Sequence, residues 1–139
     1  VKLHVRLDLT SEVGAIPSRA VLSTATVADL DAEVTGYLLA EKLVTFLLDR
    51  GYLDYGQYLR WNRTGQRFVA RIKANSKIHV ISERKPSASY IHQDATVELT
   101  DAKTGESGVF RLVTYTFVDH RGKRHRVRVL TNRWEVSAE

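Results

Sequence analysis

The sequence has no cysteine and no methionine, and only two prolines, among 139 residues. The absence of cysteine excludes disulfide frameworks, cysteine-ligated zinc and thiol nucleophiles. No apolar run approaches the roughly 20 residues that span a bilayer, and residues 1–10 lack the pattern of a signal peptide, so we expect no membrane partner. Without an initiator methionine, and with a strand-like opening, the sequence suggests a processed product or an excerpt of a longer protein.

The charge is unevenly distributed along the chain. Lys and Arg number 21 against 16 Asp and Glu, a formal charge of +5, and 43% of residues are hydrophobic, as in ordinary globular domains. Residues 1–59 hold five basic and eight acidic groups, a charge of −3, whereas residues 60–139 hold sixteen and eight, a charge of +8. This asymmetry favours a polyanionic partner such as nucleic acid for the basic half; a solvated surface of mixed charge is the alternative.

The first half alternates strand and helix patterns. Residues 1–9 alternate with period two, which predicts a strand whose inward side chains are Val1, Leu3, Val5, Leu7 and Leu9. Ile16–Thr24 predicts a second strand, at an edge or beginning near Pro17. Thr26 is the predicted N-cap of a helix that ends near Glu41, with Asp29 in a capping-box position.

A nearly continuous apolar run, Leu43–Leu48, predicts a strand buried on both faces, as at the centre of an α/β sheet. Asp54 and Gly65 are positioned to begin and end a second helix. Phe68–Lys73 predicts another strand, with Phe68, Ala70 and Ile72 on one face. This α/β half ends near Asn75.

The remaining sequence predicts strands without helices. Turn-rich segments at residues 101–105 and 119–123 predict hairpin connections. The predicted strands are Ile78–Ser82, Tyr90–Thr100, Gly108–Val118 and Lys123–Thr131. The chain therefore divides into an α/β half and a β-rich half, near the break in charge.

Asp49 is the first candidate functional residue. It follows a buried strand, where α/β sheets present ligand-binding groups, and its carboxylate can hold Mg²⁺ or Mn²⁺. The structural alternative is an Asx turn over Gly51 that ends the strand. The five histidines lack metal-ligand spacing, and no nucleophile elbow, phosphate loop or dinucleotide fingerprint is present.

Two sets of cations are candidates for DNA binding. Arg71 and Lys73 share one face of a predicted strand, with Lys77 further on, and such spacing can follow phosphates. A second period-two stripe lies opposite Val127 and Val129 and consists of Arg124, Arg126 and Arg128. Either set can equally be an ordinary exposed face.

Taken in order, several segments resemble the DDE transposases of bacterial insertion sequences, the insertion-sequence-4-like group. The most specific are Leu48-Asp49-Arg50-Gly51-Tyr52 and, about twenty residues later, Phe68-Val69-Ala70-Arg71-Ile72-Lys73-Ala74-Asn75. Weaker matches are Val1-Lys2-Leu3-His4, Ile16-Pro17, the turn with Asp29 and Leu130-Thr131-Asn132. The resemblance extends over essentially the whole chain.

The resemblance implies an α/β fold in two parts. Residues 1–75 form part of a ribonuclease-H-like core, a mixed sheet with helices, and residues 76–139 form a β-rich insertion subdomain that returns to the core near the C-terminus. It implies DNA transposition by metal-dependent strand cleavage and joining, with two Mg²⁺ or Mn²⁺ ions in the intact enzyme. Asp49 falls on the second acid of the catalytic triad, as a catalytic residue and metal ligand, and the cations named above are expected to contact DNA.

The chain departs from the family pattern at the other two acids. The first aspartate is expected on a strand before Val1, and neither Asp8 nor Asp29 matches it. The final glutamate is expected in a Tyr-x-x-Arg-x-x-x-Glu helix after the Thr-Asn turn, but Glu135 and Glu139 lack Tyr and Arg at those offsets. With one acid of three, the segment alone is expected to be inactive, because two-metal catalysis needs several carboxylates.

The implied partner is double-stranded DNA, at the transposon ends and the target, with a homodimer in a synaptic complex. The implied location is the bacterial cytoplasm, associated with the nucleoid. A non-catalytic DNA-binding module or transposase remnant is the main alternative. An unrelated α+β domain with a basic β half is a third possibility.

Overall fold

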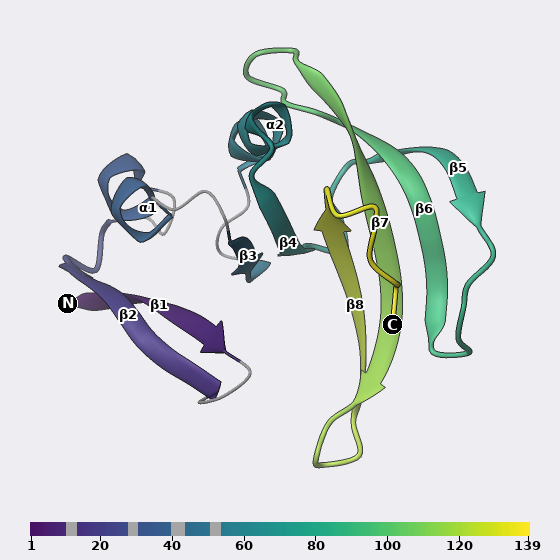
Figure 1. Ribbon diagram of the computed structural model, residues 1–139, viewed down its shortest axis with the longest axis horizontal. Helices are drawn as coiled ribbons and strands as arrows, with labels where there is room; N and C mark the ends of the chain where they lie inside the picture. Colours follow the sequence, from purple (N-terminus) through teal and green to yellow (C-terminus); the bar gives the residue numbers. More distant parts are fainter. Residues whose placement is uncertain (11–13, 28–30, 40–43, 51–53) are drawn as a thin grey trace. The chain divides into compact units, whose positions relative to one another are not determined.

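The computed structural model describes residues 1–10, 14–27, 31–39, 44–50 and 54–139, which fall into two compact units, residues 1–42 and residues 43–139. The first unit contains a two-stranded sheet and the second a six-stranded sheet (Figure 1). No helix in these described ranges is long and apolar enough to cross a membrane.

In the first unit, β1 (Lys2–Thr10) pairs antiparallel with β2 (Gly14–Ser23), which confirms both predicted strands. The predicted inward face of β1 is wrong, since Val1, Leu3, Val5, Leu7 and Leu9 are exposed, whereas His4 is only 2% exposed. The side of β1 that carries His4 and Arg6 is the side that contacts α1 (Ala32–Leu38). Nη1 of Arg6 donates to the carbonyl of Leu38, at the end of this helix, at 3.2 Å. Alternation identifies two faces of a strand but not which one is covered.

Helix α1 begins later than the sequence predicts. The Asp31 carboxylate accepts hydrogen bonds from the N–H groups of Glu33 (3.0 Å) and Val34 (3.3 Å), so it caps the helix. The predicted N-cap, Thr26, is wrong: its hydroxyl lies 2.9 Å from that of Thr24. Asp29 lies outside the described residues.

The second unit begins with β3 (Thr45–Leu48), α2 (Tyr55–Thr64) and β4 (Arg67–Ile72). Asp54 caps α2 by accepting from the Gln57 N–H at 3.3 Å, and Gly65 ends it with a φ of 73°, which confirms both predicted caps. The expectation of a central, doubly buried β3 is wrong, because β3 is an edge strand of the described sheet and Leu47 is 60% exposed.

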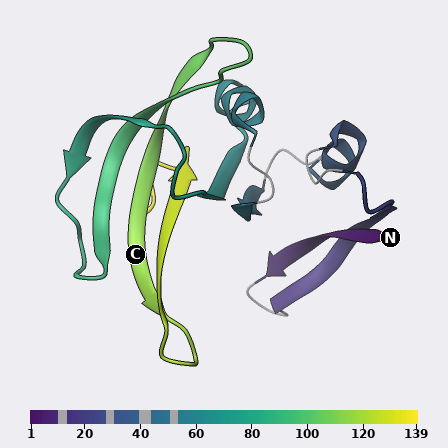
Figure 2. The same cartoon turned by 180° about the vertical axis from the view of Figure 1, so that it is seen from behind.

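The β-rich half forms four further strands, close to the predicted ranges. Together with β3 and β4 they form one six-stranded sheet, in the order β3-β4-β8-β7-β6-β5 (Figures 1 and 2). In this sheet β3 and β4 are parallel and all other neighbouring strands are antiparallel. Both predicted hairpin turns form, with Gly105 and Gly122 at positive φ. The strands are β5 (His79–Arg84), β6 (Ile91–Thr100), β7 (Ser107–Val118) and β8 (Arg124–Thr131).

The strand register defines two faces of the six-stranded sheet. Ala70, Leu130 and Leu112 lie opposite one another on the side that α2 covers, which we term the α2 face. The face of β4 that carries Phe68, Ala70 and Ile72 is the buried one, and the Phe68 ring stacks on Tyr58 of α2 at a centroid distance of 4.8 Å. The opposite face carries Arg71 and Val129, and we term it the tail face because its Arg111 and Arg84 side chains contact the C-terminal tail, residues 132–139.

Gly108→Ala is expected to destabilise the second unit by about 1–3 kcal/mol. A Cβ at residue 108 would lie 2.5 Å from Cδ2 of Leu59, a buried residue of α2, so the Leu59 side chain would have to move within the packed contact between α2 and β7. Urea unfolding followed by circular dichroism measures this loss. The control is Gly36→Ala in α1, where a Cβ meets nothing within 4 Å and the helix should gain up to about 1 kcal/mol. Equal effects of the two substitutions would contradict the packing argument.

Candidate catalytic and DNA-binding site

Asp49 lies at the carboxyl end of β3, beside the end of β4. The two strands are parallel and Leu48 is paired with Ala70, so the residues that follow them meet at one edge of the sheet. Oδ1 of Asp49 lies 3.8 Å from Nη1 of Arg71, and the Asp49 side chain is 73% exposed. The structure thus brings these two predicted site residues together and leaves the carboxylate open to solvent.

The Asp49 carboxylate also makes a local hydrogen bond. Its Oδ1 accepts from the N–H of Arg50 at 2.8 Å, as a strand-ending aspartate can, and Gly51 lies outside the described residues. One further interaction at Oδ1 does not occupy both carboxylate oxygens, so Asp49 can still supply an oxygen ligand to a hard cation.

The residues that the structure describes bring no group of three His, Cys, Asp or Glu side chains together in a metal-binding arrangement. Glu135 illustrates why: its carboxylate is bound by Arg133 (3.0 Å) and Arg67 (3.2 Å), and Arg67 is paired with Thr45, at the start of β3. Four residues of strand, roughly 13 Å, therefore separate that end of the sheet from Asp49. The residues present fit one metal ligand rather than a complete site.

Glu135 is held in its charged form by these contacts. Its own backbone N–H and the Arg133 side chain lower the pKa of the Glu135 carboxyl below its ordinary value. The glutamate serves to attach the tail to the start of β4.

The predicted DNA-binding cations are spread over both sides of the sheet. Arg71 is half-buried on the tail face, and Lys73 and Lys77 are exposed in the segment after β4. The other three project from β8 on the α2 face, opposite Val118, Thr116 and Thr114 respectively; they are Arg124, Arg126 and Arg128. The register therefore does not bring Arg71 onto the same face as the β8 stripe.

Arg128 differs from the other two arginines of β8. Its Nη1 donates to the carbonyls of Lys73 (3.2 Å) and Ala74 (2.7 Å), so it links β8 to the exit of β4. Arg124 and Arg126 are exposed. Two of the three stripe residues thus present their guanidinium groups to solvent.

A buried ion pair on the tail face was not anticipated from the sequence. Asp94 and Arg111, 6% and 7% exposed, form two hydrogen bonds of 2.9 and 2.7 Å, and Arg84 approaches the same carboxylate at 3.2 Å. The hydrogen bond from Arg111 lowers the pKa of Asp94, and the bond to Asp94 raises that of Arg111. The sequence carried no clear signal for it, because Asp94 alternates with Thr96 and Glu98 and so lies on what is otherwise a polar face of β6.

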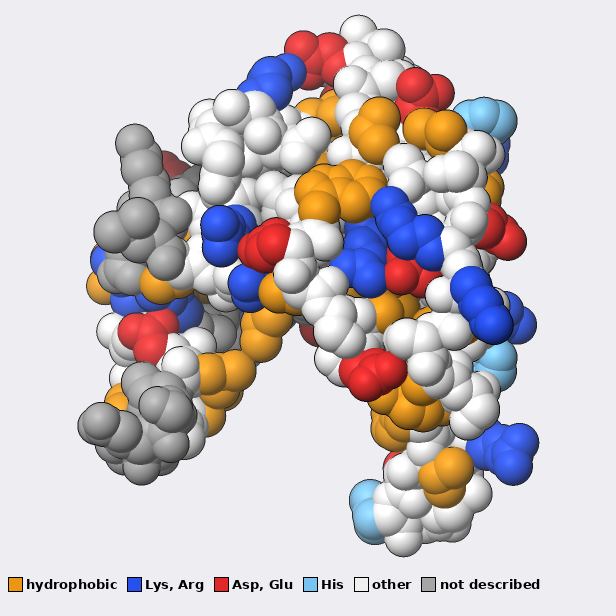
Figure 3. Space-filling view, turned by 45° about the vertical axis from the view of Figure 1, so that its right-hand side comes forward, with side chains coloured by type: hydrophobic (Ala, Val, Ile, Leu, Met, Phe, Trp, Pro, Cys, Tyr) orange, Lys and Arg blue, Asp and Glu red, His pale blue; other side chains and the backbone are white. Residues whose placement is uncertain are grey.

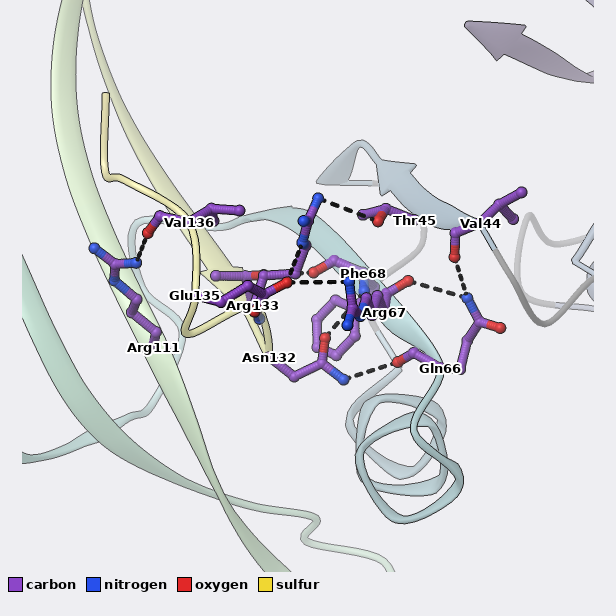
Figure 4. Close-up of polar contacts among 11 residues, drawn as sticks. Val44, Thr45, Gln66, Arg67, Phe68, Arg111, Asn132, Arg133, Glu135 and Val136 are labelled. Atoms are coloured by element: carbon purple, nitrogen blue, oxygen red, sulfur yellow. Dashed lines mark hydrogen bonds and ion pairs between the residues drawn. The ribbon is translucent and has the colours of Figure 1, made fainter.

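The same arginines hold the tail against the sheet. Arg111 donates from Nη1 to the carbonyl of Val136 at 2.6 Å (Figure 4), and the Arg84 guanidinium lies over the Trp134 ring, 5.3 Å from its centroid. The side chain of Asn132 accepts from the Phe68 N–H (3.0 Å) and donates to the Gln66 carbonyl (2.8 Å), which extends the pairing of β8 with β4.

The arrangement is that of an α/β domain that presents an aspartate at the end of a parallel strand, in a chain of net charge +5 suited to a polyanionic substrate. The chain belongs to the transposase DDE domain family, whose profile matches residues 1–136. The family carries out DNA transposition and generally uses divalent metal ions. No curated protein and no solved structure matches the chain.

Asp94→Asn is expected to lower the free energy of unfolding by about 3 kcal/mol at neutral pH, because it leaves the buried Arg111 without its anion. Urea unfolding measures the change. The matched control is Glu106→Gln, which breaks an exposed pair with Arg63 and should cost less than about 1 kcal/mol. A loss at residue 94 no larger than the control would contradict a stabilising role of the pair.

The same pair predicts a pH dependence. Because the pKa of Asp94 is lower in the folded state, its contribution is complete above its unfolded pKa and is lost as the pH falls through its folded pKa. The difference in stability between wild type and Asp94→Asn should therefore shrink below about pH 4. A difference that stays constant down to pH 2 would contradict this.

Proposed function

We propose that this chain is the central part of the catalytic domain of an insertion-sequence-4-like DDE transposase, in which Asp49 is the second acid of the triad. The observation that carries the proposal is the position of Asp49, exposed at the carboxyl end of a strand parallel to β4, within a chain of this family. Asp49 acts there as a catalytic residue and metal ligand.

The path of the chain supports a core with an insertion. Residues 1–75 correspond to the ribonuclease-H-like core part and residues 76–139 to the insertion. After β4 the chain forms β5, β6 and β7 and then returns as β8, which pairs with β4 from Ile72↔Arg128 to Val69↔Thr131. This pairing, in which β8 lies beside the strand that accompanies Asp49, supports the proposed return of the insertion to the core.

The residues of this chain supply one ligand and a cationic surround. Two Mg²⁺ or Mn²⁺ ions, when bound in the intact enzyme, activate the attacking oxygen and stabilise the leaving oxygen of the DNA backbone. Asp49 offers one carboxylate, and Arg71 beside it offers a cation to a nearby phosphate. The other acids are expected from outside this segment, as the family resemblance implies.

The partner in this proposal is double-stranded DNA, both transposon ends and target, bound by a dimer of the intact transposase. Arg71, Lys73 and Lys77 surround the end of β4, and Arg124, Arg126 and Arg128 extend along β8. Such cations bind phosphates without selecting sequence.

In the intact transposase, Asp49→Ala is expected to abolish cleavage of transposon-end DNA and to leave DNA affinity nearly unchanged, because one metal ligand is lost and no phosphate-binding cation is removed. A gel assay with Mg²⁺ measures cleavage, and fluorescence anisotropy measures binding. The control is Glu106→Ala, an exposed acid in the turn between β6 and β7, away from Asp49 and from the candidate DNA-binding cations. Equal loss of binding and cleavage at residue 49 would instead indicate a structural aspartate.

The 139-residue chain by itself is expected to leave DNA uncut, since one carboxylate cannot hold two dications. The measurement is incubation with supercoiled plasmid carrying terminal repeats, in Mg²⁺ and in Mn²⁺. Nicked product would contradict the prediction. DNA binding without cleavage by the intact protein as well would favour the alternative, a non-catalytic DNA-binding module or transposase remnant.

A further inference from the structure

The hairpin of β7 and β8 projects beyond its neighbours in the sheet. The pairing of β6 with β7 reaches Tyr115, and the pairing of β4 with β8 reaches Arg128. Three further cross-strand pairs join β7 and β8; in the first of them the Thr116 N–H still donates to the Tyr90 carbonyl at 2.9 Å, and Asp119 closes the turn that follows. We term this projecting segment, residues 116–126, the ribbon; both cartoon views show it extending past the other strands (Figures 1 and 2).

The ribbon carries exposed cations without acidic partners in the described part of the chain. They are Arg121, Lys123, Arg124 and Arg126. The acid of the ribbon, Asp119, is already engaged: its Oδ2 lies 2.7 Å from Nε2 of His125, and its Oδ1 accepts from the N–H groups of Arg121 and Lys123 at 2.9 Å. The space-filling view shows Lys, Arg and His side chains at this projecting end (Figure 3).

The two faces of the ribbon differ. Arg124 and Arg126 share one face with Val118, which is 58% exposed, because Val118 is paired with Arg124 and Thr116 with Arg126. On the other face the Phe117 ring stacks on His125 at a centroid distance of 5.1 Å. The ribbon therefore combines exposed apolar side chains with cations that have no acidic partner among the described residues. Such a surface is suited to a polyanion that also presents apolar groups, as nucleic-acid bases do.

The dimensions of the ribbon fit the major groove of DNA but not the minor groove. The major groove is about 12 Å wide and 8.5 Å deep and admits a two-stranded β-ribbon, whereas the minor groove, about 6 Å wide, does not. The two strands lie about 4.8 Å apart, and three residue pairs extend roughly 10 Å. Arg128, held by the carbonyls of Lys73 and Ala74, lies at the base and outside the projecting part.

We propose that the ribbon inserts into the major groove of duplex DNA, with Arg124 and Arg126 directed at the phosphates along the groove and Val118 beside them on the same face. The choice of DNA as the polyanion rests on the proposed function. Entry of the ribbon into the groove makes this end of the β-rich half a DNA-binding element. That element includes Arg121, Lys123 and the Phe117–His125 pair.

The first test is the salt dependence of binding to a short labelled duplex. The double variant Arg124→Gln, Arg126→Gln should reduce the slope of log K against log salt by about two, because each phosphate contact contributes about 0.9. The matched control is Lys85→Gln, Lys103→Gln, two exposed cations outside the ribbon, which should leave the slope unchanged. Circular dichroism verifies that both variants are folded. An unchanged slope in the ribbon variant would overturn the proposal.

The second test distinguishes the grooves. A duplex in which every cytosine is glucosylated 5-hydroxymethylcytosine has its major groove filled, and the wild-type chain should bind it roughly tenfold more weakly than the unmodified duplex. Netropsin, which fills the minor groove of A·T tracts, should have no effect. The ribbon variant should lose its sensitivity to glucosylation.

The outcomes separate this proposal from the proposed function. Equal affinity for glucosylated and unmodified duplex, or tighter binding of single strands, would overturn groove insertion. If Arg71→Gln weakened duplex binding while the ribbon variant bound as wild type, insertion would be wrong and the DNA-binding function would stand. Absence of binding to any duplex would contradict both.

Discussion

The packing of α2 against β4 is the contact on which the rest of the second unit depends. The Tyr58 ring stacks on Phe68, and the rings of Trp61 and of Phe110 in β7 lie 5.5 and 5.9 Å from the Phe68 ring. Burial raises the pKa of the Tyr58 hydroxyl, with Tyr55 and Asp54 contributing. Because this aromatic cluster covers one face of the sheet, alternate residues of β4 must project from the other, which is how Arg71 comes to lie beside Asp49.

The tail face is stabilised by a different interaction. Among the described residues of the second unit, α2 is the only helix and lies on the opposite face; on the tail face, the tail contacts the buried Asp94–Arg111 pair instead. A buried ion pair gains stability only when its remaining hydrogen-bonding groups are satisfied, and the Val136 carbonyl and Arg84 supply those partners. The tail, the ion pair and β4 thus form one network, which ends at Arg67 and Glu135.

The two elements of the proposed function lie at the same end of the six-stranded sheet. Asp49 and Arg71 lie where the parallel strands β3 and β4 end, in the part assigned to the transposase core. The ribbon begins just beyond Arg128, which is paired with Ile72 at the end of β4, in the part assigned to the insertion. Asp49 and the cations of the ribbon present charge to solvent. A polyanionic substrate is compatible with both, as expected for a transposase DDE domain.

Much of this protein follows from its sequence alone. Residue patterns, among them the apolar run at residues 43–48, placed the strands of the described residues, and Asp54 and Gly65 placed α2. Leu48-Asp49-Arg50-Gly51-Tyr52 with Phe68–Asn75 indicated the family that residues 1–136 match. These features depend on local geometry and short-range hydrogen bonds. Only the tertiary structure decided that β1 buries its His4 side, that β3 is an edge strand, that Arg71 and Arg128 lie on opposite faces, and that Asp94 meets Arg111. Period-two alternation has two equivalent faces, and which face is covered, and by what, depends on residues distant in the chain.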